Sequence, residues 1–534
     1  MNSLFHVGGK PFFSIGGQLN NSTSSDYKLT EKAFETCAKM GLNTVAAPVH
    51  WELFEKEEGV YDFTQIDMLM ELARHKGLKL VVLWFGTWKN GNSHYVPEWV
   101  KLQKERFLWS KAYDGAEIRS LSPVCEATKL ADMRAFCMLC GHIAENNSDE
   151  CVIGVQVENE PGLIGAARDY SPLATKLFKS QIPVDAAEYI GKNGTWEETF
   201  GFYAAEFFTA YYIAHYIDEI AEAGKKLLDL PMYINVWLGE MYAHIPGTNY
   251  PSGGAVSKTF SFWKHLLKHV DAIAPDIYVS DYREVDELFK IYSGEGNIFH
   301  LPESSPMPLS MTNSIRAVAE YALTGVHTFG IDILSAAADK SALNAMAASG
   351  TEGAKKASLL REIADSYTIL KFSKPLIEKY QGTGRLYAVA QYEGAANQVF
   401  EFENYIGEIE FLNMESAPIN GGNVRRMDNR HMAESYDSYR AKGFIVDAGN
   451  GEFYLTGDAY KLRLYPKFSL EELTSAVHAG DFLNTRTQGY LSVTEGEFTP
   501  DGEYKVNIIR NGDEYDYGLW VTSDIGVLRV RMDR

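Results

Sequence analysis

Short apolar runs alternate with amphipathic stretches along the first part of the chain. From residue 11 to about residue 335 the runs have the length of strands, and the stretches between them carry apolar positions at helical spacing. The predicted strands lie at residues 11–18, 43–50, 78–85, 152–158, 231–237, 272–277, 297–302 and 326–331. Eight strands alternating with helices predict parallel βαβ units, and closing eight such units gives a (β/α)8 TIM barrel.

The clearest repeat lies near the N-terminus. Residues 43–50 form a predicted strand, and residues 63–76 carry apolar side chains on one helical face. Gly77 stands where a glycine usually ends a helix, and the next strand begins directly after it. An open, doubly wound sheet is the structural alternative, but no glycine-rich phosphate loop follows the first predicted strand. Further helices are expected at residues 133–145 and 202–223, and long loops at residues 86–125 and 160–200.

The pattern changes after a helix predicted at residues 354–372. Segments such as 397–403 and 452–456 alternate apolar and polar positions, and Asn511-Gly512 is a strong turn signal. We therefore predict two domains, a catalytic barrel over residues 1–372 and an all-β, sandwich-like domain over residues 373–534. The pattern leaves open whether the second part is one sandwich or two small ones.

Composition and charge narrow the class of protein. Of the 534 residues, 46% are hydrophobic and 23% are charged, which is typical of an ordered globular protein. A net charge of −21 would repel phosphate backbones and anionic lipid, so neither nucleic acid nor a membrane is an expected partner. The N-terminus lacks a secretory signal pattern, and no run of about 18 apolar residues occurs. We therefore expect a cytoplasmic protein.

Cysteine and histidine usage gives no metal or redox motif. Five cysteines make no disulfide framework in a chain of this length. Cys137 and Cys140 form a CxxC within a predicted helix, and no second pair follows at zinc spacing, which favours packing in the core. The histidines show no spacing that converges on an ion. We therefore predict no metal and no cofactor.

Two glutamates end predicted barrel strands. The fourth strand runs into Gln156-Val-Glu-Asn-Glu-Pro161, and the seventh ends at Glu303. Active sites of such barrels lie at the C-terminal ends of the strands, so Glu160 and Glu303 should face each other. Cleavage of a glycosidic bond with retention needs a carboxyl acid and a carboxylate nucleophile about 5–5.5 Å apart. Glu160 would be the acid/base and Glu303 the nucleophile.

Each assignment has a structural alternative. Asn-Glu-Pro can begin a helix, with Pro161 in its first turn and acidic residues facing the helix dipole. With 71 acidic residues in the chain, some will end strands without a catalytic role. Asn159, directly before Glu160, has an amide suited to the 2-hydroxyl of a sugar, where contacts strengthen in the transition state.

The same segments carry a family resemblance. Val157-Glu-Asn-Glu-Pro161, a glutamate ending strand seven and Trp51-Glu-Leu-Phe-Glu-Lys-Glu-Glu-Gly-Val-Tyr-Asp-Phe63 resemble the clan of retaining (β/α)8 glycosidases. Gly16-Gly-Gln-Leu-Asn-Asn-Ser22, Trp84-Phe-Gly-Thr-Trp-Lys-Asn-Gly91 and Asp169-Tyr-Ser-Pro172 are similar to bacterial β-galactosidases of glycoside hydrolase family 35.

The resemblance implies β-galactosidase activity by double displacement, with Glu160 preferred to Glu158 as acid/base and Glu303 as nucleophile. It also implies that Tyr278, after strand six, hydrogen-bonds the nucleophile. The strand-three sequence departs from the proline-rich motif of the eukaryotic-type members, so the sugar stays open.

Other polar and aromatic residues at strand ends are candidate substrate contacts. Trp88 and Trp237 have rings that stack under sugars or close a barrel top by packing. Lys89 and Asn90 have donors and acceptors for hydroxyl groups, although solvation of a loop explains them equally well. Gln18 and His50 end strands one and two.

The leading hypothesis is a retaining exo-β-glycosidase acting on terminal non-reducing β-D-galactosyl residues of an oligosaccharide or other β-glycoside. The first alternative keeps the chemistry with another sugar, as in a β-glucosidase, β-mannosidase or β-xylosidase, or with an endo-acting cleft. A second is a non-catalytic carbohydrate-binding barrel. A lyase or aldolase would need a Schiff-base lysine ending a strand or phosphate-binding glycines, and neither occurs. Homo-oligomers are common among such enzymes, which favours a dimer or larger assembly.

Overall fold

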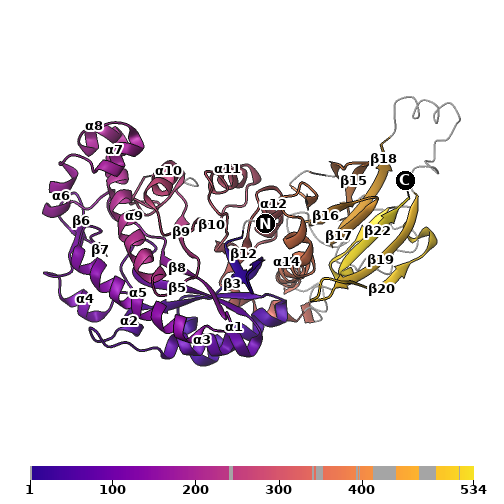
Figure 1. Ribbon diagram of the computed structural model, residues 1–534, viewed down its shortest axis with the longest axis horizontal. Helices are drawn as coiled ribbons and strands as arrows, with labels where there is room; N and C mark the ends of the chain where they lie inside the picture. The colour runs from indigo at the N-terminus through magenta and orange to yellow at the C-terminus, as the bar shows by residue number, and fades with distance from the viewer. Residues whose placement is uncertain are drawn as a thin grey trace. The chain divides into compact units, whose positions relative to one another are not determined.

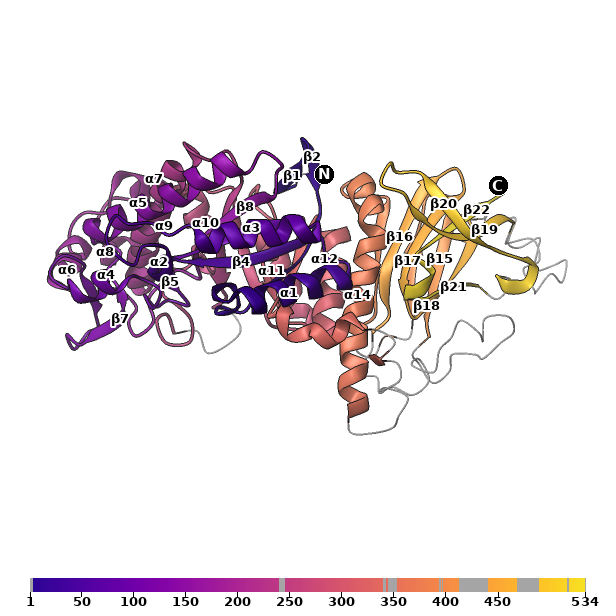
Figure 2. The same ribbon diagram turned by 90° about the horizontal axis from the view of Figure 1, so that it is seen from below.

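The computed structural model describes residues 3–239, 245–339, 342–343, 353–392, 395, 397–412, 440–467, 489–515 and 518–533. The chain divides into two compact units. The barrel unit comprises Asn2–Ser305 and Leu323–Ile333, and the C-terminal unit comprises chiefly Pro306–Ala322 and Leu334–Arg534. Figures 1 and 2 show the barrel strands with helices around them, and the β-sheets of the C-terminal unit.

An eight-stranded parallel sheet forms the barrel unit. Its order is β11-β10-β9-β8-β5-β4-β3-β12, and a bridge between Leu301 and Val326 joins the two ends of that order. The strands are β3 (Ser14–Gln18), β4 (Thr44–His50), β5 (Lys79–Lys89), β8 (Val152–Asn159), β9 (Met232–Trp237), β10 (Ala272–Ile277), β11 (Glu303–Ser304) and β12 (Gly325–Phe329). The predicted (β/α)8 barrel is confirmed.

The strands form where the chain is apolar on both faces. Every residue of β4 and of β8 is buried, as expected of barrel strands covered by helices outside and side chains inside. The third helix begins at Thr64 and ends at Lys76, and Gly77 adopts the left-handed conformation with φ +67°. Glycine permits that conformation at little steric cost, so the turn into β5 follows directly.

The seventh strand differs from its prediction. Residues 297–302 are extended but pair with a neighbour only at Leu301, and the regular ladder is the two-residue β11 that begins at Glu303. The first predicted strand is also divided, into β2 (Lys10–Phe12) and β3. The β2 segment pairs with β1 (Phe5–Val7) in a hairpin, because the chain bends at Phe13 between two ladders.

Helices and a hairpin fill the connections of the barrel unit. The predicted long loop at residues 86–125 contains α4 and the antiparallel pair of β6 (Trp109–Lys111) and β7 (Glu117–Leu121). The helices of this unit are α1 (Tyr27–Met40), α2 (Trp51–Phe54), α3 (Thr64–Lys76), α4 (Glu98–Leu102), α5 (Glu126–Asn146), α6 (Pro172–Phe178), α7 (Val184–Ile190), α8 (Trp196–Phe200), α9 (Ala204–Lys225), α10 (Ser257–Leu266) and α11 (Tyr282–Tyr292), with short 3-10 turns at Thr23–Ser25 and Gly201–Tyr203.

The C-terminal unit has two antiparallel sheets and helices α12 (Pro308–Glu320) and α14 (Gly353–Tyr380). One sheet has the order β13-β16-β17-β22-β19-β20 and the other β14-β15-β18-β21. Both contribute to one apolar core, which contains Ile409, Leu462 and Val530, so the described strands form a single sandwich. The strands are β13 (Leu386–Ala390), β14 (Asn397–Glu401), β15 (Tyr405–Phe411), β16 (Lys442–Gly449), β17 (Glu452–Asp458), β18 (Tyr460–Pro466), β19 (Tyr490–Phe498), β20 (Tyr504–Arg510), β21 (Leu519–Val521) and β22 (Val527–Met532).

The predicted boundary after residue 372 falls inside α14. In the structure this helix packs with the C-terminal strands β16 and β17, and α12 also belongs to the C-terminal unit. The change from helical to alternating pattern therefore marks the end of a helix and not the division between units.

Cys137 and Cys140 both lie in α5 and are free thiols. Among the described residues, no helix is long and apolar enough to cross a membrane.

Two buried histidines in the barrel unit give an expected pH dependence of stability. The ring of His300 lies edge-on to those of Phe5 and His327, at centroid distances of 5.1 and 4.9 Å. Burial holds the pKa of His300 well below its usual range and lowers the pKa of His327 to about 3. In the unfolded chain both rings would protonate near pH 6.5. The stability that the two neutral rings contribute to the fold is therefore fully present above about pH 6.5. It is lost as the pH falls toward the pKa values of the folded state.

Replacing His300 with phenylalanine should reduce this acid sensitivity. The slope of unfolding free energy against pH should fall by about 1.4 kcal/mol per pH unit between about pH 4 and pH 6. Urea unfolding at a series of pH values measures the slope. His75→Phe, at an exposed position, is the control and should leave the slope unchanged. Equal slopes for wild type and His300→Phe would contradict the neutral, buried state of His300.

Candidate active site

Three carboxyl groups meet at the C-terminal ends of barrel strands. Glu160 follows β8, Asp276 lies near the end of β10, and Glu303 begins β11. One carboxyl oxygen from each lies within 4.8 Å of the others, and the residues are only 6%, 2% and 3% exposed. The two glutamates are therefore close enough to act on one glycosidic bond, which needs a pair of carboxyl groups beside it.

Glu303 is held by four donors. Its Oε1 accepts hydrogen bonds from Gln18 Nε2 at 2.7 Å and, more weakly, from the side-chain amides of Asn159 and Asn235 at 3.4 Å. Its Oε2 accepts from the hydroxyl of Tyr278 at 2.8 Å. These donors fix the orientation of the carboxylate at the barrel mouth, as a nucleophile requires.

Glu160 is placed to hold a proton near neutral pH. Burial is the largest cause that raises the pKa of Glu160, and the neighbouring charge of Glu303 adds to it, while the ammonium of Lys89 acts in the opposite direction. The resulting pKa is about 7. A carboxyl group with such a pKa can donate a proton and later accept one, which is what an acid/base catalyst must do.

Glu158 lies two positions before Glu160 but bonds a different part of the barrel. Glu158 and Glu160 both adopt left-handed backbone angles, with φ of +62° and +46°. Non-glycine residues rarely do so, and such strain concentrates at functional sites. Glu158 accepts from the backbone N–H groups of Thr87 and Trp88 at 3.0 and 2.6 Å.

A second buried carboxylate accompanies Glu158. Burial, followed by the charge of Asp132, raises the pKa of Glu158 well above its usual value. Asp132 accepts from Trp84 Nε1 at 2.8 Å and from the hydroxyl of Thr87 at 2.6 Å. This Glu158–Asp132 pair anchors the end of β5 and is separate from the cluster that contains Glu160.

Asn235 and Asp276 belong to the site but were not among the predicted residues. Asn235, in β9, accepts from the backbone N–H of Glu160 at 2.8 Å and donates to Asp276 Oδ2 at 2.7 Å. Both are polar residues inside otherwise apolar strands, and that interruption was the available sequence signal. Each lies within a strand rather than directly after one, so the pattern of polar residues at strand ends does not indicate them.

The predicted residues after strand three occupy different positions. Lys89 Nζ is buried and donates to Asn159 Oδ1 at 2.8 Å, so the lysine orients the amide that faces Glu303. The backbone of Asn90 donates to the Asn159 carbonyl at 3.2 Å, and its φ is +53°. Trp88 is fully buried: its indole donates to Ser120 at 3.1 Å, and its ring packs edge-on to Tyr216. That ring belongs to the core, which corrects its prediction as a surface for sugar stacking.

The other three predicted substrate contacts, Gln18, Trp237 and His50, differ in where they lie relative to the carboxyl cluster. Gln18 is part of the cluster through its bond to Glu303, and its own Oε1 is buried without a hydrogen-bond partner in the described structure. Trp237, half-buried at the end of β9, pairs in register with Asp276. His50 bonds the Asn21 carbonyl at 2.8 Å, stacks on Tyr95 and lies outside the network around Glu303. Its imidazole therefore supports the end of β4.

The carboxyl cluster is also the group of described residues with spacing suited to a metal ion. Carboxylate oxygens suit hard cations, but a ligating group must lose its proton. The raised pKa values of Glu160 and Asp276 oppose that loss near neutral pH. That the reaction needs no metal ion stays a prediction.

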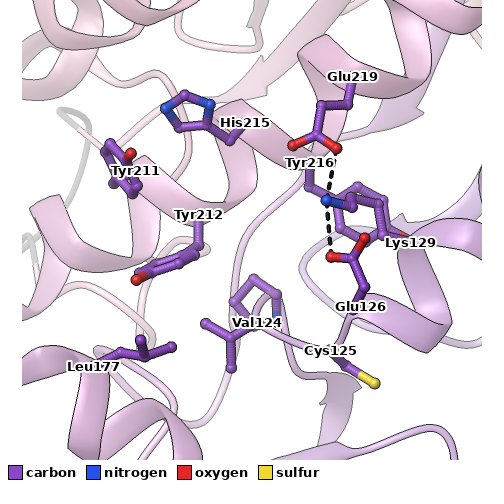
Figure 3. Close-up of a pocket in the computed structure, with 11 residues that line it drawn as sticks. Val124, Cys125, Glu126, Lys129, Leu177, Tyr211, Tyr212, His215, Tyr216 and Glu219 are labelled. Carbon is purple, nitrogen blue, oxygen red and sulfur yellow. Dashed lines mark ion pairs between the residues drawn. The ribbon is translucent and has the colours of Figure 1, made fainter. Parts of the chain in front are cut away.

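A separate pocket of about 260 Å³ lies among the helices of the barrel unit (Figure 3). Its walls come from the start of α5, from α6 and from α9. Charged groups on its walls are paired with one another: Lys129 contacts Glu126 at 2.9 Å and Glu219 at 2.6 Å. His215 contacts Asp185 at 2.8 Å. The pocket contains none of the three clustered carboxyl groups.

Removing the hydroxyl of Tyr278 should weaken catalysis without affecting the fold. Hydrogen bonds to charged groups contribute about 1.5–3 kcal/mol, so Tyr278→Phe should lower kcat/KM by about 10- to 100-fold. Tyr282→Phe, on the adjacent exposed helix, is the control and should retain wild-type kinetics. Equal kcat/KM for Tyr278→Phe and wild type on an aryl glycoside would reject the role of this contact.

Models of two protein families match parts of this chain. Residues 4–201 match the model of the family described as glycosyl hydrolases family 35, and residues 363–522 match a domain of unknown function, DUF5597. A search of curated proteins gives no match.

Similar folds occur among solved structures. A β-galactosidase from Bacillus circulans sp. alkalophilus is 16% identical, with a TM-score of 0.50 over 70% of this chain and 57% of its own. The catalytic domain of a β-amylase from Paenibacillus polymyxa is 15% identical, with a TM-score of 0.44 over 62% of this chain and 94% of its own. The chain thus spans little more than half the length of the first enzyme, and at this identity the likeness is one of fold.

Proposed function

We propose that this glycoside hydrolase, in which residues 4–201 match family 35, is a retaining exo-β-glycosidase that removes terminal non-reducing β-D-galactosyl residues. The observation that carries the proposal is the pair of buried carboxyl groups, Glu160 and Glu303, with oxygens within 4.8 Å at the ends of β8 and β11. In a retaining glycosidase the two carboxyl groups are about 5–5.5 Å apart, so that the nucleophile contacts the sugar directly.

In the first step, Glu303 attacks the anomeric carbon while Glu160 protonates the oxygen of the departing group. The carbon–oxygen bond to the leaving group breaks, and an ester bond between the sugar and Glu303 forms. Gln18 and Tyr278 hold the attacking carboxylate in line. The proton that Glu160 gives up is the one that burial and the charge of Glu303 retain on it.

In the second step, water replaces the leaving group. Once Glu303 is esterified, its charge no longer raises the pKa of Glu160, so the Glu160 carboxylate can accept a proton from the water. The hydroxide equivalent attacks the anomeric carbon and releases Glu303. Two inversions give net retention.

Galactose is the proposed sugar. The family 35 match and the fold of a β-galactosidase favour galactose. Hydroxyl specificity depends on a few donors at the mouth, and Asn159, Lys89 and Trp237 are the proposed contacts. Asn159 is the candidate for the 2-hydroxyl because its amide lies beside the nucleophile.

Hydrolysis of a panel of nitrophenyl α- and β-glycosides tests the proposal, with product anomers followed by NMR. The β-galactoside should be the best substrate, and its first product should be the β-anomer. An α-anomer as first product would reject retention. Preference for a β-glucoside, β-mannoside or β-xyloside would keep the chemistry and change the sugar. No turnover of any member would favour a non-catalytic carbohydrate-binding barrel.

A further inference from the structure

Asp276 is a third buried acid in the site, and the double-displacement scheme gives it no task. It lies in β10, and the parallel ladder places it in register with Glu303 on β11. Asn235 donates to its Oδ2 at 2.7 Å. Its Oδ1 is buried and accepts no hydrogen bond from the described residues.

The surroundings of Asp276 and Glu303 are unequal. Glu303 accepts hydrogen bonds from four side chains, whereas Asp276 accepts one, from Asn235. A buried carboxylate is stable only when its oxygens are satisfied, so a proton is better accommodated on Asp276 than on Glu303. The Oδ1 without a donor is the natural position for that proton.

The partner for such a proton is the carboxyl of Glu160. One of its carboxyl oxygens lies within 4.8 Å of a carboxyl oxygen of Asp276, and its backbone N–H donates to the same Asn235 that binds Asp276. Two facing carboxyl groups attract each other only when they share a proton. An ionised Glu160 is therefore stabilised by a protonated Asp276.

We propose that Asp276 keeps a proton throughout the reaction and donates it in a hydrogen bond to Glu160, which makes Asp276 a positioning residue for the acid/base. The proposal rests on the function proposed above. When Glu160 transfers its own proton to the leaving oxygen, the Asp276 hydroxyl stabilises the carboxylate that forms. When water returns a proton to Glu160, Asp276 is unchanged, so it neither gains nor loses a proton over the cycle.

The charges around the site agree with this assignment. Burial is the main cause that raises the pKa of Asp276 well above its usual value, and the charges of Glu303 and Glu160 add to it. Lys89, on β5, opposes the shift. The other titratable groups beside Asp276 are the phenols of Tyr278, which directly follows β10, and of Tyr233 on β9. Burial raises the pKa of both, so both are neutral.

Infrared spectroscopy of the full chain tests the proton directly and needs no substrate. Above the pH at which Glu160 ionises, wild-type protein labelled with [4-¹³C]aspartate should retain a protonated-carboxyl band that the label shifts. Asp276→Asn should lack this band. The raised pKa of Glu158 predicts a second band, but the aspartate label leaves glutamate bands in place. Absence of a label-sensitive band in wild type would overturn the proposal, whether or not the variant folds.

Kinetics test the hydrogen bond to Glu160. Asp276→Asn retains an N–H donor without charge, so the alkaline limb of kcat/KM should keep its position. Asp276→Ala removes the donor and should move that limb upward by about 0.5–1 pH unit, because the Glu160 carboxylate loses a hydrogen bond. Asp271→Asn, which alters an aspartate at the other end of β10 that pairs with Lys225, is the matched control and should leave the limb unchanged.

The remaining outcomes separate this proposal from the proposed function. A downward shift of the alkaline limb in both Asp276 variants would show that Asp276 is ionised in the wild type. No shift of the limb in either variant would show that Asp276 does not affect the ionisation of Glu160. Both results would overturn the proposal. Failure of wild type on the whole glycoside panel, with the label-sensitive band present, would reject the glycosidase function while leaving the proton on Asp276 established.

Discussion

Glu303→Ala should lose turnover of a β-galactoside by about 10⁴-fold or more, because the variant lacks the carboxylate that attacks the anomeric carbon in the first step. Glu303 accepts hydrogen bonds from Gln18 and Tyr278, so alanine leaves a small polar space beside the substrate. Added azide should enter that space and restore part of the activity. The product should be the glycosyl azide of inverted configuration, since only one displacement then occurs. Product analysis by NMR gives both the rate and the anomer.

Glu287→Ala, on the exposed surface of α11, is the matched control and should retain full activity. A Glu303→Ala variant with wild-type turnover would reject Glu303 as nucleophile. Rescue by azide with retained configuration would also reject it, because that stereochemistry indicates that the missing group was the acid/base.

Glu160→Ala should slow the hydrolysis of substrates with poor leaving groups more than that of substrates with good ones. Protonation by a general acid contributes about 10²- to 10⁴-fold, and substrates with poor leaving groups need it most. The turnover of substrates with poor leaving groups should fall by about 10²- to 10⁴-fold. The rate at which an acidic phenol is released in the first step should change little. The pH profile should change as well. Glu160 donates only when protonated and its pKa is about 7, so wild-type activity should decline above about pH 7 and the variant should lose this alkaline limb.

A series of aryl glycosides whose phenols differ in acidity measures how the rate depends on the leaving group. Glu158→Gln is the control two positions away, since Glu158 bonds the backbone of Thr87 and Trp88 instead of facing the cluster. It should cost stability but keep the wild-type dependence on the leaving group. Equal slowing of all members by Glu160→Ala would contradict the acid role.

The sequence identified Glu160 and Glu303 because each follows a predicted strand, and strand ends meet at one face of a barrel. It could not identify Asp276 in the same way. A single aspartate inside an apolar strand looks like a packing irregularity until the register beside Glu303 is known. Trp88 illustrates the reverse case: its position after the predicted third strand made it a candidate for stacking under a sugar, while in the structure β5 continues to Lys89 and the ring is buried.

The sequence by itself determined the kinds of elements and their order. Spacing of apolar residues, Gly77 at a helix end and the change to alternating positions near the C-terminus are local signals, because helix and strand periods are read over neighbouring residues. Only the tertiary structure decided which side chains meet. Asn159 and Glu303 are separated by 144 positions and bond across the site. Their distance, the turn of Glu158 away from the cluster and the raised pKa of Glu160 all depend on burial and on charges from other strands, which no local pattern contains.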